Sequence, residues 1–419
     1  MKNLKLLLSI QLIISILTVL GCSEQKHIER ENIQNFYSSD NALHPEYKVF
    51  HIHDTTTIVY YQFNFADFAY KREAVILAFK ARYMLKYELY NDFTAKNIID
   101  SASVVFVDSL NYKKDNSSLG YFELNIPRGK EYILRLKLTD LNAEKSVVNI
   151  ITINKKEGLN RQNFYLQASD GLPVMHSYVE RNQDYQLVYN DLSVKKLYVK
   201  YFTNFHKPPK PPMSDNPQKK VTRLKSDSSY TIEMRKGHSV NLRFSKQGIY
   251  HFYADSLNPT GFTVFVFTSG YPYVSTQMQM LMPLRYITTG SEFKKLINSK
   301  DKKKAVDEFW LNISSGEESA KSFISMYYNR VQDANILFPS DREGWMTDRG
   351  MIFIVYGPPE RVFKNAGLET WVYGTSAHRT TMKFNFIKND NPFTDNDYQL
   401  NRSPSYINSW SAAVEYWRR

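Results

Sequence analysis

Five charged residues in the last quarter of the chain lie where turns are expected: Asp348, Arg349, Glu360, Arg361 and Glu369. A carboxylate can act as a general acid or base, and an arginine can clamp a carboxylate, so an exposed set would line a reactive cleft. The same residues would instead fix the fold if Arg349 or Arg361 paired with one of these acids. Because no histidine, nucleophile or metal-ligand set accompanies them, we expect the ion-pairing role and predict no catalytic residue.

Other catalytic patterns are weak or missing from the sequence. It contains no Walker loop, no His-Glu-x-x-His, no Gly-x-Ser-x-Gly and no paired cysteine motif. His51 and His53 would lie on one face of a strand, next to Asp54. A four-coordinate metal needs more partners than this segment supplies, so we expect solvated histidines there and neither a metal site nor another cofactor.

The single cysteine, Cys22, follows an amino-terminal export signal. Two lysines precede an almost wholly apolar run, residues 6–20, which is too short and too early for a membrane span. The run ends in Val-Leu-Gly-Cys, which resembles the lipobox of bacterial lipoproteins. We therefore expect a signal peptide at 1–21 and a lipid anchor on Cys22. Ser23, by resemblance to sorting rules in diderm bacteria, favours the outer membrane, on its periplasmic face or at the cell surface.

A basic, proline-rich stretch between positions 195 and 225 stands out in a chain whose formal net charge is +12. It contains nine Lys or Arg residues and one acid, Asp215. Such a stretch suits nucleic acid, anionic lipid or polysaccharide, or an acidic protein. The export signal argues against nucleic acid, and we expect a solvated loop rather than a specific anion site. The lysines that would form an anion site are Lys207, Lys210, Lys219 and Lys220.

The elements that must position these residues are mainly strands. Seven strand-like runs separated by turn residues predict an immunoglobulin-like β-sandwich over 46–156, and a similar series predicts a second one over 157–275 with the basic loop inside it. Residues 22–45 are polar, and we expect a tether there. Thus the fold class is mainly β, followed by an α+β domain over 276–419.

Within 276–419, capping patterns and apolar stripes predict two short helices and a longer one. The apolar run 351–356 predicts a buried strand, with Gly-Pro-Pro as its rigid exit. Further strands are expected at 370–373 and 382–387, and a last helix from Ile407. All five tryptophans lie at or beyond position 310, which favours a core separate from those of the sandwiches.

The segment Gly344-Trp-Met-Thr-Asp-Arg-Gly350, with its Gly-Pro-Pro companion, resembles the GWxTD domain of predicted Bacteroidota lipoproteins. The resemblance covers about 280–419, and it implies β-rich, immunoglobulin-like amino-terminal domains and an outer-membrane setting. It carries no established activity, so no catalytic residue is transferred. The glycines are free to take positive φ, and Trp345 would plug the core between the long helix and the small sheet. The candidate partner site is Gly344, Trp345, Thr347, Asp348, Arg349, Gly350, Glu360, Arg361, Glu369 and Trp371.

These observations predict a non-enzymatic outer-membrane lipoprotein that acts as a scaffold. Its two sandwiches would serve as spacers, and the GWxTD domain would bind an outer-membrane or periplasmic protein of an assembly or secretion complex. One alternative is an envelope enzyme or glycan-binding protein that uses a cleft around the motif. Another is an anionic lipid or polysaccharide binder that uses the basic loop.

Overall fold

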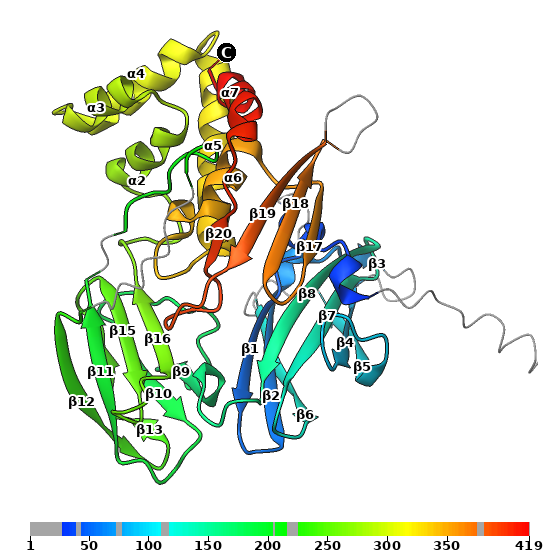
Figure 1. Ribbon diagram of the computed structural model, residues 1–419. Coiled ribbons are helices and arrows are strands. Elements are labelled where there is room, and N and C mark those ends of the chain that lie inside the picture. The colour runs from blue at the N-terminus through cyan, green and yellow to red at the C-terminus, as the bar shows by residue number, and fades with distance from the viewer. Residues whose placement is uncertain are drawn as a thin grey trace, which may run out of the picture.

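The computed structural model describes residues 27–38, 43–72, 78–109, 117–203, 206–215, 225–374 and 381–418. The predicted signal peptide, Cys22, Lys219 and Lys220 lie outside these residues. Two β-rich units are followed by a carboxy-terminal unit of helices and a small sheet (Figure 1). Among the described residues, no helix is both long and apolar enough to cross a membrane.

The first unit is an antiparallel β-sandwich. One sheet has the order β1-β2-β6. The other has the order β3-β4-β7-β8, and its fifth strand, β5, also pairs with β4. Alternate side chains of both sheets form its core, as in Val59, Leu85 and Leu134. The bounds are β1 Glu46–His51, β2 Thr56–Asn64, β3 Lys71–Arg72, β4 Phe79–Tyr90, β5 Ile98–Ser109, β6 Ser117–Asn125, β7 Glu131–Asp140 and β8 Lys145–Asn154.

The second unit joins eight strands in one sheet, in the order β14-β10-β13-β12-β11-β15-β16 with β9 on β10. Strand β12 pairs with both β11 and β13, so it links the two parts of the sheet around a separate core that includes Leu187, Leu197 and Phe252. The bounds are β9 Phe164–Ala168, β10 Asp184–Tyr189, β11 Lys196–Phe202, β12 Ser228–Arg235, β13 His238–Ser239, β14 Leu242–Arg243, β15 Gly248–Tyr253 and β16 Gly261–Val266.

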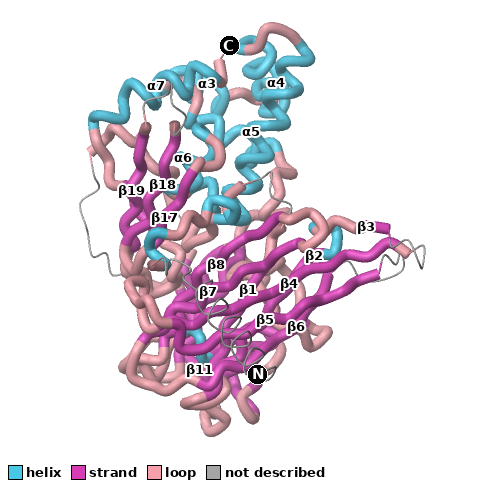
Figure 2. The backbone as a smooth tube through the Cα atoms, turned by 90° about the vertical axis from the view of Figure 1, so that its right-hand side faces the viewer, coloured by secondary structure: helices cyan, strands magenta, loops and turns pink. Residues whose placement is uncertain are grey.

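The carboxy-terminal unit packs helices against a four-stranded sheet of order β17-β18-β19-β20 (Figure 2). The expected short helices, long helix and last helix are all present. The bounds are α2 Gln277–Leu281, α3 Gly290–Asn298, α4 Lys302–Ile313, α5 Glu317–Leu337, α6 Asp348–Tyr356, β17 Arg361–Lys364, β18 Leu368–Tyr373, β19 Met382–Lys388, β20 Tyr398–Leu400 and α7 Ile407–Tyr416.

The predicted strand at 351–356 is wrong, because these residues belong to helix α6. Thr347 caps the helix by accepting a hydrogen bond from the Gly350 amide, and Gly357 ends it with a φ of 87°. The residues from Asp348 to Val355 are all buried. A helix buried on every side lacks the polar face that gives amphipathic helices their period, so its apolar run reads equally well as a strand.

The predicted tether is also wrong where the structure describes it. Residues 27–38 form two short 3-10 helices, Ile28–Arg30 and Gln34–Phe36, and pack into the core of the carboxy-terminal unit. The Ile33 amide donates to the Val362 carbonyl of β17 at 3.0 Å. On the other side, Arg135 of β7 donates to both carboxylate oxygens of Glu31, at 2.5 and 2.6 Å.

This amino-terminal segment joins two units that the tryptophan distribution had predicted to be separate. One buried cluster contains Ile28 and Tyr37 of the segment, Ile133 and Ile150 of the first sandwich, and Trp371 of β18. The two sandwiches keep their own internal cores. The prediction of separate cores is therefore correct for the interiors of the sandwiches. It is wrong where the first sandwich contacts the carboxy-terminal unit, because the two share one buried cluster there.

Candidate functional site

The two glycines of the motif allow backbones to touch. A Cβ atom on Gly344 would lie 1.9 Å from the Ala334 carbonyl oxygen of α5, and one on Gly350 would lie 2.0 Å from the Gly344 carbonyl oxygen. Neither glycine has positive φ, so the predicted reason for them is wrong. Glycine is required here because α5, the turn at 344–346 and α6 cross without room for a side chain.

Thr347 and Asp348 fasten the start of α6. The Thr347 hydroxyl donates to the Gly344 carbonyl at 2.7 Å and accepts from the Gly350 amide at 3.0 Å. The Asp348 carboxylate accepts from the Leu400 amide at 2.8 Å and from two nitrogens of Arg402, at 2.5 and 3.1 Å. Burial raises the pKa of Asp348, and the Arg402 guanidinium opposes that rise.

Arg349 and Glu369 form a second ion pair, and their side chains are only 2% and 0% exposed. The Arg349 Nη1 atom lies 3.3 Å from Glu369 Oε2, while the guanidinium carbon lies 4.2 Å from the Tyr398 ring centre and 5.0 Å from that of Phe338. The other Glu369 oxygen accepts from the indole nitrogen of Trp371 at 2.7 Å. This pair therefore ties α6 to the sheet.

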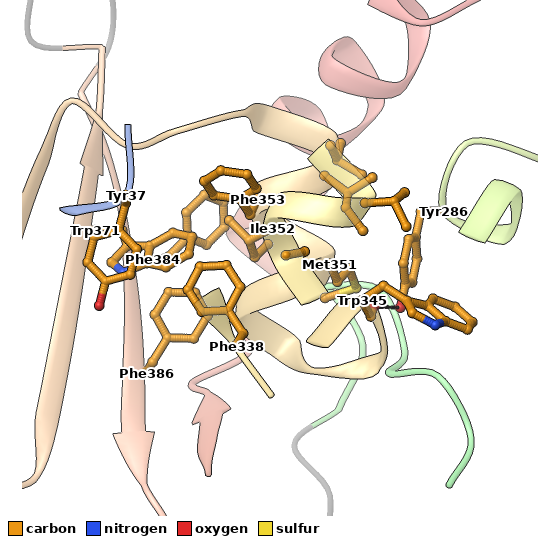
Figure 3. Close-up of a cluster of buried hydrophobic side chains, with 14 of the residues drawn as sticks. Tyr37, Tyr286, Phe338, Trp345, Met351, Ile352, Phe353, Trp371, Phe384 and Phe386 are labelled. Carbon is orange, nitrogen blue, oxygen red and sulfur yellow. Dashed lines mark hydrogen bonds between the residues drawn. The ribbon is translucent and has the colours of Figure 1, made fainter. Parts of the chain in front are cut away.

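Trp345 is buried, but not between the long helix and the sheet as predicted. Its indole nitrogen donates to Glu343 at 2.7 Å, its amide donates to the Asn335 side chain at 3.1 Å, and its carbonyl accepts from the Tyr286 hydroxyl at 2.8 Å. Trp345 and Tyr286 lie at one end of the cluster in Figure 3, and Trp371 lies at the other. Trp345 thus fills the junction of α5 with the turn at 282–286.

The remaining charged residues of the set lie elsewhere. Glu360 is half-buried and accepts from the Gly374 amide at 3.0 Å, and Arg361 is exposed at the start of β17. The structure therefore does not bring the five charged residues together in a cleft. Asp348 pairs with Arg402 and Arg349 with Glu369, which is the ion-pairing role that we expected.

A polar cleft of about 710 Å³ lies beside the motif. Its walls come from the basic loop and from the carboxy-terminal unit, and include Lys210, Asp215, Arg342, Asp397 and Gln399. Asp348 and Arg402 also line the cleft, and they form an ion pair with each other. The cleft thus presents both signs of charge, together with amide and hydroxyl groups, to any molecule that enters.

The basic loop is only partly the solvated loop that we expected. Its backbone is held against the carboxy-terminal unit, because the Lys210 carbonyl accepts from Arg402 at 3.2 Å and the Pro212 carbonyl accepts from the Ser403 amide at 3.1 Å. The side chains of Lys207 and Lys210 are exposed. The loop therefore holds Lys210 at a fixed place beside the cleft, with the exposed Lys207 three residues before it.

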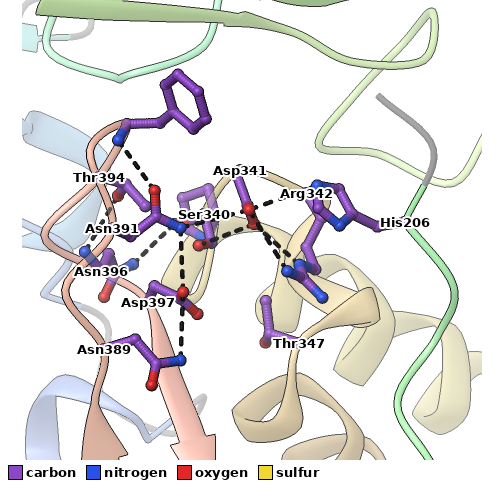
Figure 4. Close-up of polar contacts among 12 residues, drawn as sticks. His206, Ser340, Asp341, Arg342, Thr347, Asn389, Asn391, Thr394, Asn396 and Asp397 are labelled. Atoms are coloured by element: carbon purple, nitrogen blue, oxygen red, sulfur yellow. Dashed lines mark hydrogen bonds and ion pairs between the residues drawn. The ribbon is translucent and has the colours of Figure 1, made fainter. Parts of the chain in front are cut away.

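A network centred on Asp341 fixes the other end of the loop (Figure 4). Asp341 lies 2.9 Å from Arg342 Nε and 3.4 Å from His206 Nε2, and Asn391 donates to both Asp341 and Asp397 at 3.3 and 3.0 Å. Burial alone would raise the pKa of Asp341, but Arg342 and His206 hold it below its ordinary value. Burial lowers the pKa of His206, although Asp341 opposes this effect.

Sequence reasoning missed this network. Its members come from three distant segments, and the only local signal was the position of Asp341 and Arg342 just before the motif. Among the described residues, no group of three or more His, Cys, Asp or Glu side chains is arranged to hold a metal ion. The predicted solvated histidine is wrong at His51, which is buried in the first sandwich and has both ring nitrogens engaged, with Thr57 at 3.0 Å and the Asn154 carbonyl at 2.9 Å.

The fold and the motif define a β-rich protein in which two buried ion pairs hold helix α6 inside the carboxy-terminal α+β unit. Residues 248–419 match the model of the GWxTD domain family, so this part of the chain is a GWxTD domain. The match begins earlier than the predicted position 280 and takes in β15 and β16. No curated protein matches the sequence.

The similar solved structures are distant. The BSP domain of a biofilm-associated protein is 13% identical over 54% of this chain, with a TM-score of 0.23, and the match spans 30% of that structure. The CBD12 region of CALX1.2 is 9% identical over 50% of this chain and 79% of its own, with a TM-score of 0.14. Neither similarity assigns a function to this chain.

Proposed function

We propose that this protein is a non-enzymatic, lipid-anchored scaffold of the outer membrane whose GWxTD domain binds a protein of an envelope assembly or secretion complex. The supporting observation is the pairing of Asp348 with Arg402 and of Arg349 with Glu369 inside the domain. A residue used for chemistry must reach its substrate, whereas these side chains are at most 8% exposed and hold α6 to its neighbours.

The packing of the amino-terminal segment supports a specific arrangement on the membrane. Ile28 is in the buried cluster, and only four residues lie between Cys22, which would carry the lipid, and His27. The five residue-to-residue steps from Cys22 to His27 span at most about 18 Å. The lipid would therefore hold the GWxTD domain close to the bilayer, rather than at the end of a long tether.

Fractionation of a Cys22→Ala variant tests the anchor. This variant should leave the membrane fraction or stay unprocessed, because two or three acyl chains anchor a protein far more strongly than protein contacts at a headgroup surface do. A correctly cleaved Cys22→Ala protein that still needs detergent for extraction would contradict lipid anchoring.

Photo-crosslinking in intact cells tests partner binding. A photoreactive residue at Lys210 faces the cleft, and a matched one at Lys246 is exposed on the second β-rich unit. We expect a discrete protein adduct from position 210 and none from position 246. Equal labelling from both positions, or none from either, would contradict binding at the cleft.

A second candidate function is supported by the exposed Lys207 and Lys210 of the basic loop. Anionic lipid or polysaccharide would be attracted to such a loop, and membrane attachment would bring it near anionic headgroups. The alternative of an enzyme or glycan-binding site at the motif itself has less support, because the motif side chains are buried and paired.

A further inference from the structure

Strand β5 (Ile98–Ser109) forms an open edge of the first sandwich. It pairs antiparallel with β4 along almost its whole length, and no described strand pairs with its other side. In Figure 1 it lies beyond β4, at the outer end of its sheet. Half of its backbone amides and carbonyls therefore point away from β4 without a strand to receive them.

This edge has few of the features that usually prevent strand addition. Natural edge strands are short or carry lysine, proline or a bulge, whereas β5 has twelve residues and contains no Lys, Arg or Pro. Its only irregularity lies near its beginning, opposite Leu89 and Tyr90. The residues from Ile98 to Val105 are all exposed, and Val104, Val105 and Val107 are 45%, 51% and 55% exposed.

The strand is nevertheless held rigidly by its inward face. The ring of Phe106 stacks on Tyr83 with 5.2 Å between ring centres. The Tyr70 hydroxyl donates to Asp108 at 2.7 Å, and the Tyr87 hydroxyl donates to Asp100 at 3.0 Å. Residues 101, 103, 105 and 107 alternate with these inward residues and face outward. The edge is thus preorganised for a second strand.

We propose that β5 pairs antiparallel with β5 of a second copy of this chain, about a two-fold axis at Val105. In this register Val105 lies opposite Val105 of the partner subunit, and Ser103 lies opposite Val107 of the partner subunit. Asp108 lies opposite Ala102 of the partner subunit. The register centred on Val104 would place Asp100 opposite Asp108 of the partner subunit, which like-charge repulsion disfavours.

A second copy suits this edge better than a foreign strand because the edge is complementary to itself. Branched valine side chains face each other, and the two carboxylates avoid one another. A two-fold contact of this kind closes on itself and leaves no free β5 edge, so it yields a dimer rather than a fibre. This dimerisation goes beyond partner binding by the GWxTD domain and is independent of it.

Light scattering after gel filtration tests the dimer, with the mature chain carrying Cys22→Ser so that no lipid is attached. Val105→Lys places two ammonium groups against each other, and Val240→Lys makes the same change at an exposed valine outside β5. We expect a concentration-dependent dimer for the parent and for Val240→Lys, and a dissociation constant at least about tenfold higher for Val105→Lys. A monomer at every concentration, or a dimer unaffected by Val105→Lys, would overturn the proposal.

Cysteine pairing tests the register in the same background. Val105→Cys should form a disulfide between copies, because opposite residues in antiparallel strands have Cα atoms about 4.5–5.5 Å apart. Ser103→Cys should not pair with itself, because its counterpart lies about 13 Å along the strand, but it should pair with Val107→Cys. Equal self-pairing of Ser103→Cys and Val105→Cys would contradict the register.

Discussion

The ion pair of Asp348 with Arg402 gives a direct test of whether the motif stabilises the fold. The two side chains are 8% and 4% exposed, so neither charge is well hydrated. Asp348→Asn keeps an oxygen that can accept from the Leu400 amide but removes the charge opposite Arg402. The guanidinium would keep its hydrogen bonds to the carbonyls of Lys210 and Leu400, at 3.2 and 3.4 Å, but would lose the carboxylate that balances its charge.

The expected loss follows from leaving one charge buried without its partner. Removing one member of a buried pair typically costs about 3–5 kcal/mol. We therefore expect Asp348→Asn to lower the unfolding free energy of the GWxTD domain by about 3–5 kcal/mol. From the sequence alone, where the carboxylate loses its charge but keeps an oxygen for a backbone donor, the expected cost is about 1–3 kcal/mol.

A double-mutant cycle separates the pair from other effects. Arg402→Met should also be destabilising, but Asp348→Asn combined with Arg402→Met removes both charges and leaves none unpaired. The double variant should be more stable than the sum of the single losses predicts, by about 2–3 kcal/mol. Arg361→Met is a matched control, because Arg361 is exposed, and it should stay within about 0.5 kcal/mol of the parent.

Urea unfolding followed by tryptophan fluorescence measures these changes, because all five tryptophans lie between positions 310 and 417 and report on this domain. Two results would refute the reasoning. One is additivity of the two single losses, and the other is an Asp348→Asn protein as stable as the parent. If that protein also bound its partner but failed in cells, the scaffold proposal would be wrong.

Three further predictions use the same purified chain. Trp345→Ala should destabilise the domain by about 3–5 kcal/mol in urea unfolding, since Trp345 is buried and its indole donates to Glu343. Burial lowers the pKa of His251 to about 4, so the stability that the neutral, buried imidazole contributes is complete above the ordinary pKa of 6.5 and is lost as the pH falls toward 4. His251→Gln should therefore make the melting temperature depend less on pH in that range. An unchanged slope of melting temperature against pH would contradict this. Replacing Lys207, Lys210, Lys219 and Lys220 by Gln should weaken binding to anionic vesicles in a salt-dependent way without changing the melting temperature, whereas unchanged binding at low salt would indicate a merely solvated loop.

Most strands could be predicted because half-buried strands alternate apolar and polar residues along the chain. Helix α6 could not be predicted from its apolar run, since Met-Ile-Phe-Ile-Val-Tyr suits a buried strand equally well. The better signals were at its ends, where Thr347 precedes an acid in the first turn and Gly357 precedes proline. The β-branched residues between them outweighed these caps in the prediction.

The amino-terminal segment shows a different limit of composition. Its polar residues predicted a tether, yet its four apolar side chains Ile28, Ile33, Phe36 and Tyr37 are enough to bind it between the first sandwich and β17. Its polar residues are not free, because Glu31 pairs with Arg135 and the Asn32 side chain accepts from the Val362 amide at 2.8 Å. A polar segment with regularly placed apolar residues can therefore be part of a core.

The ion pairs of the motif show why its role could be expected although only one of the two partners, Glu369, was in the predicted set and Arg402 was not. Arg349 pairs with a residue 20 positions away and Asp348 with one 54 positions away. Sequence reasoning favoured pairing because no histidine, nucleophile or metal-ligand set accompanies these charges, yet Arg402 lies in no motif and would have seemed an ordinary surface residue. Its burial and its contact with the Lys210 carbonyl instead connect the GWxTD motif to the basic loop. A change at Arg402 should therefore disturb the motif and the cleft wall together, whereas a change at the exposed Arg361 should disturb neither.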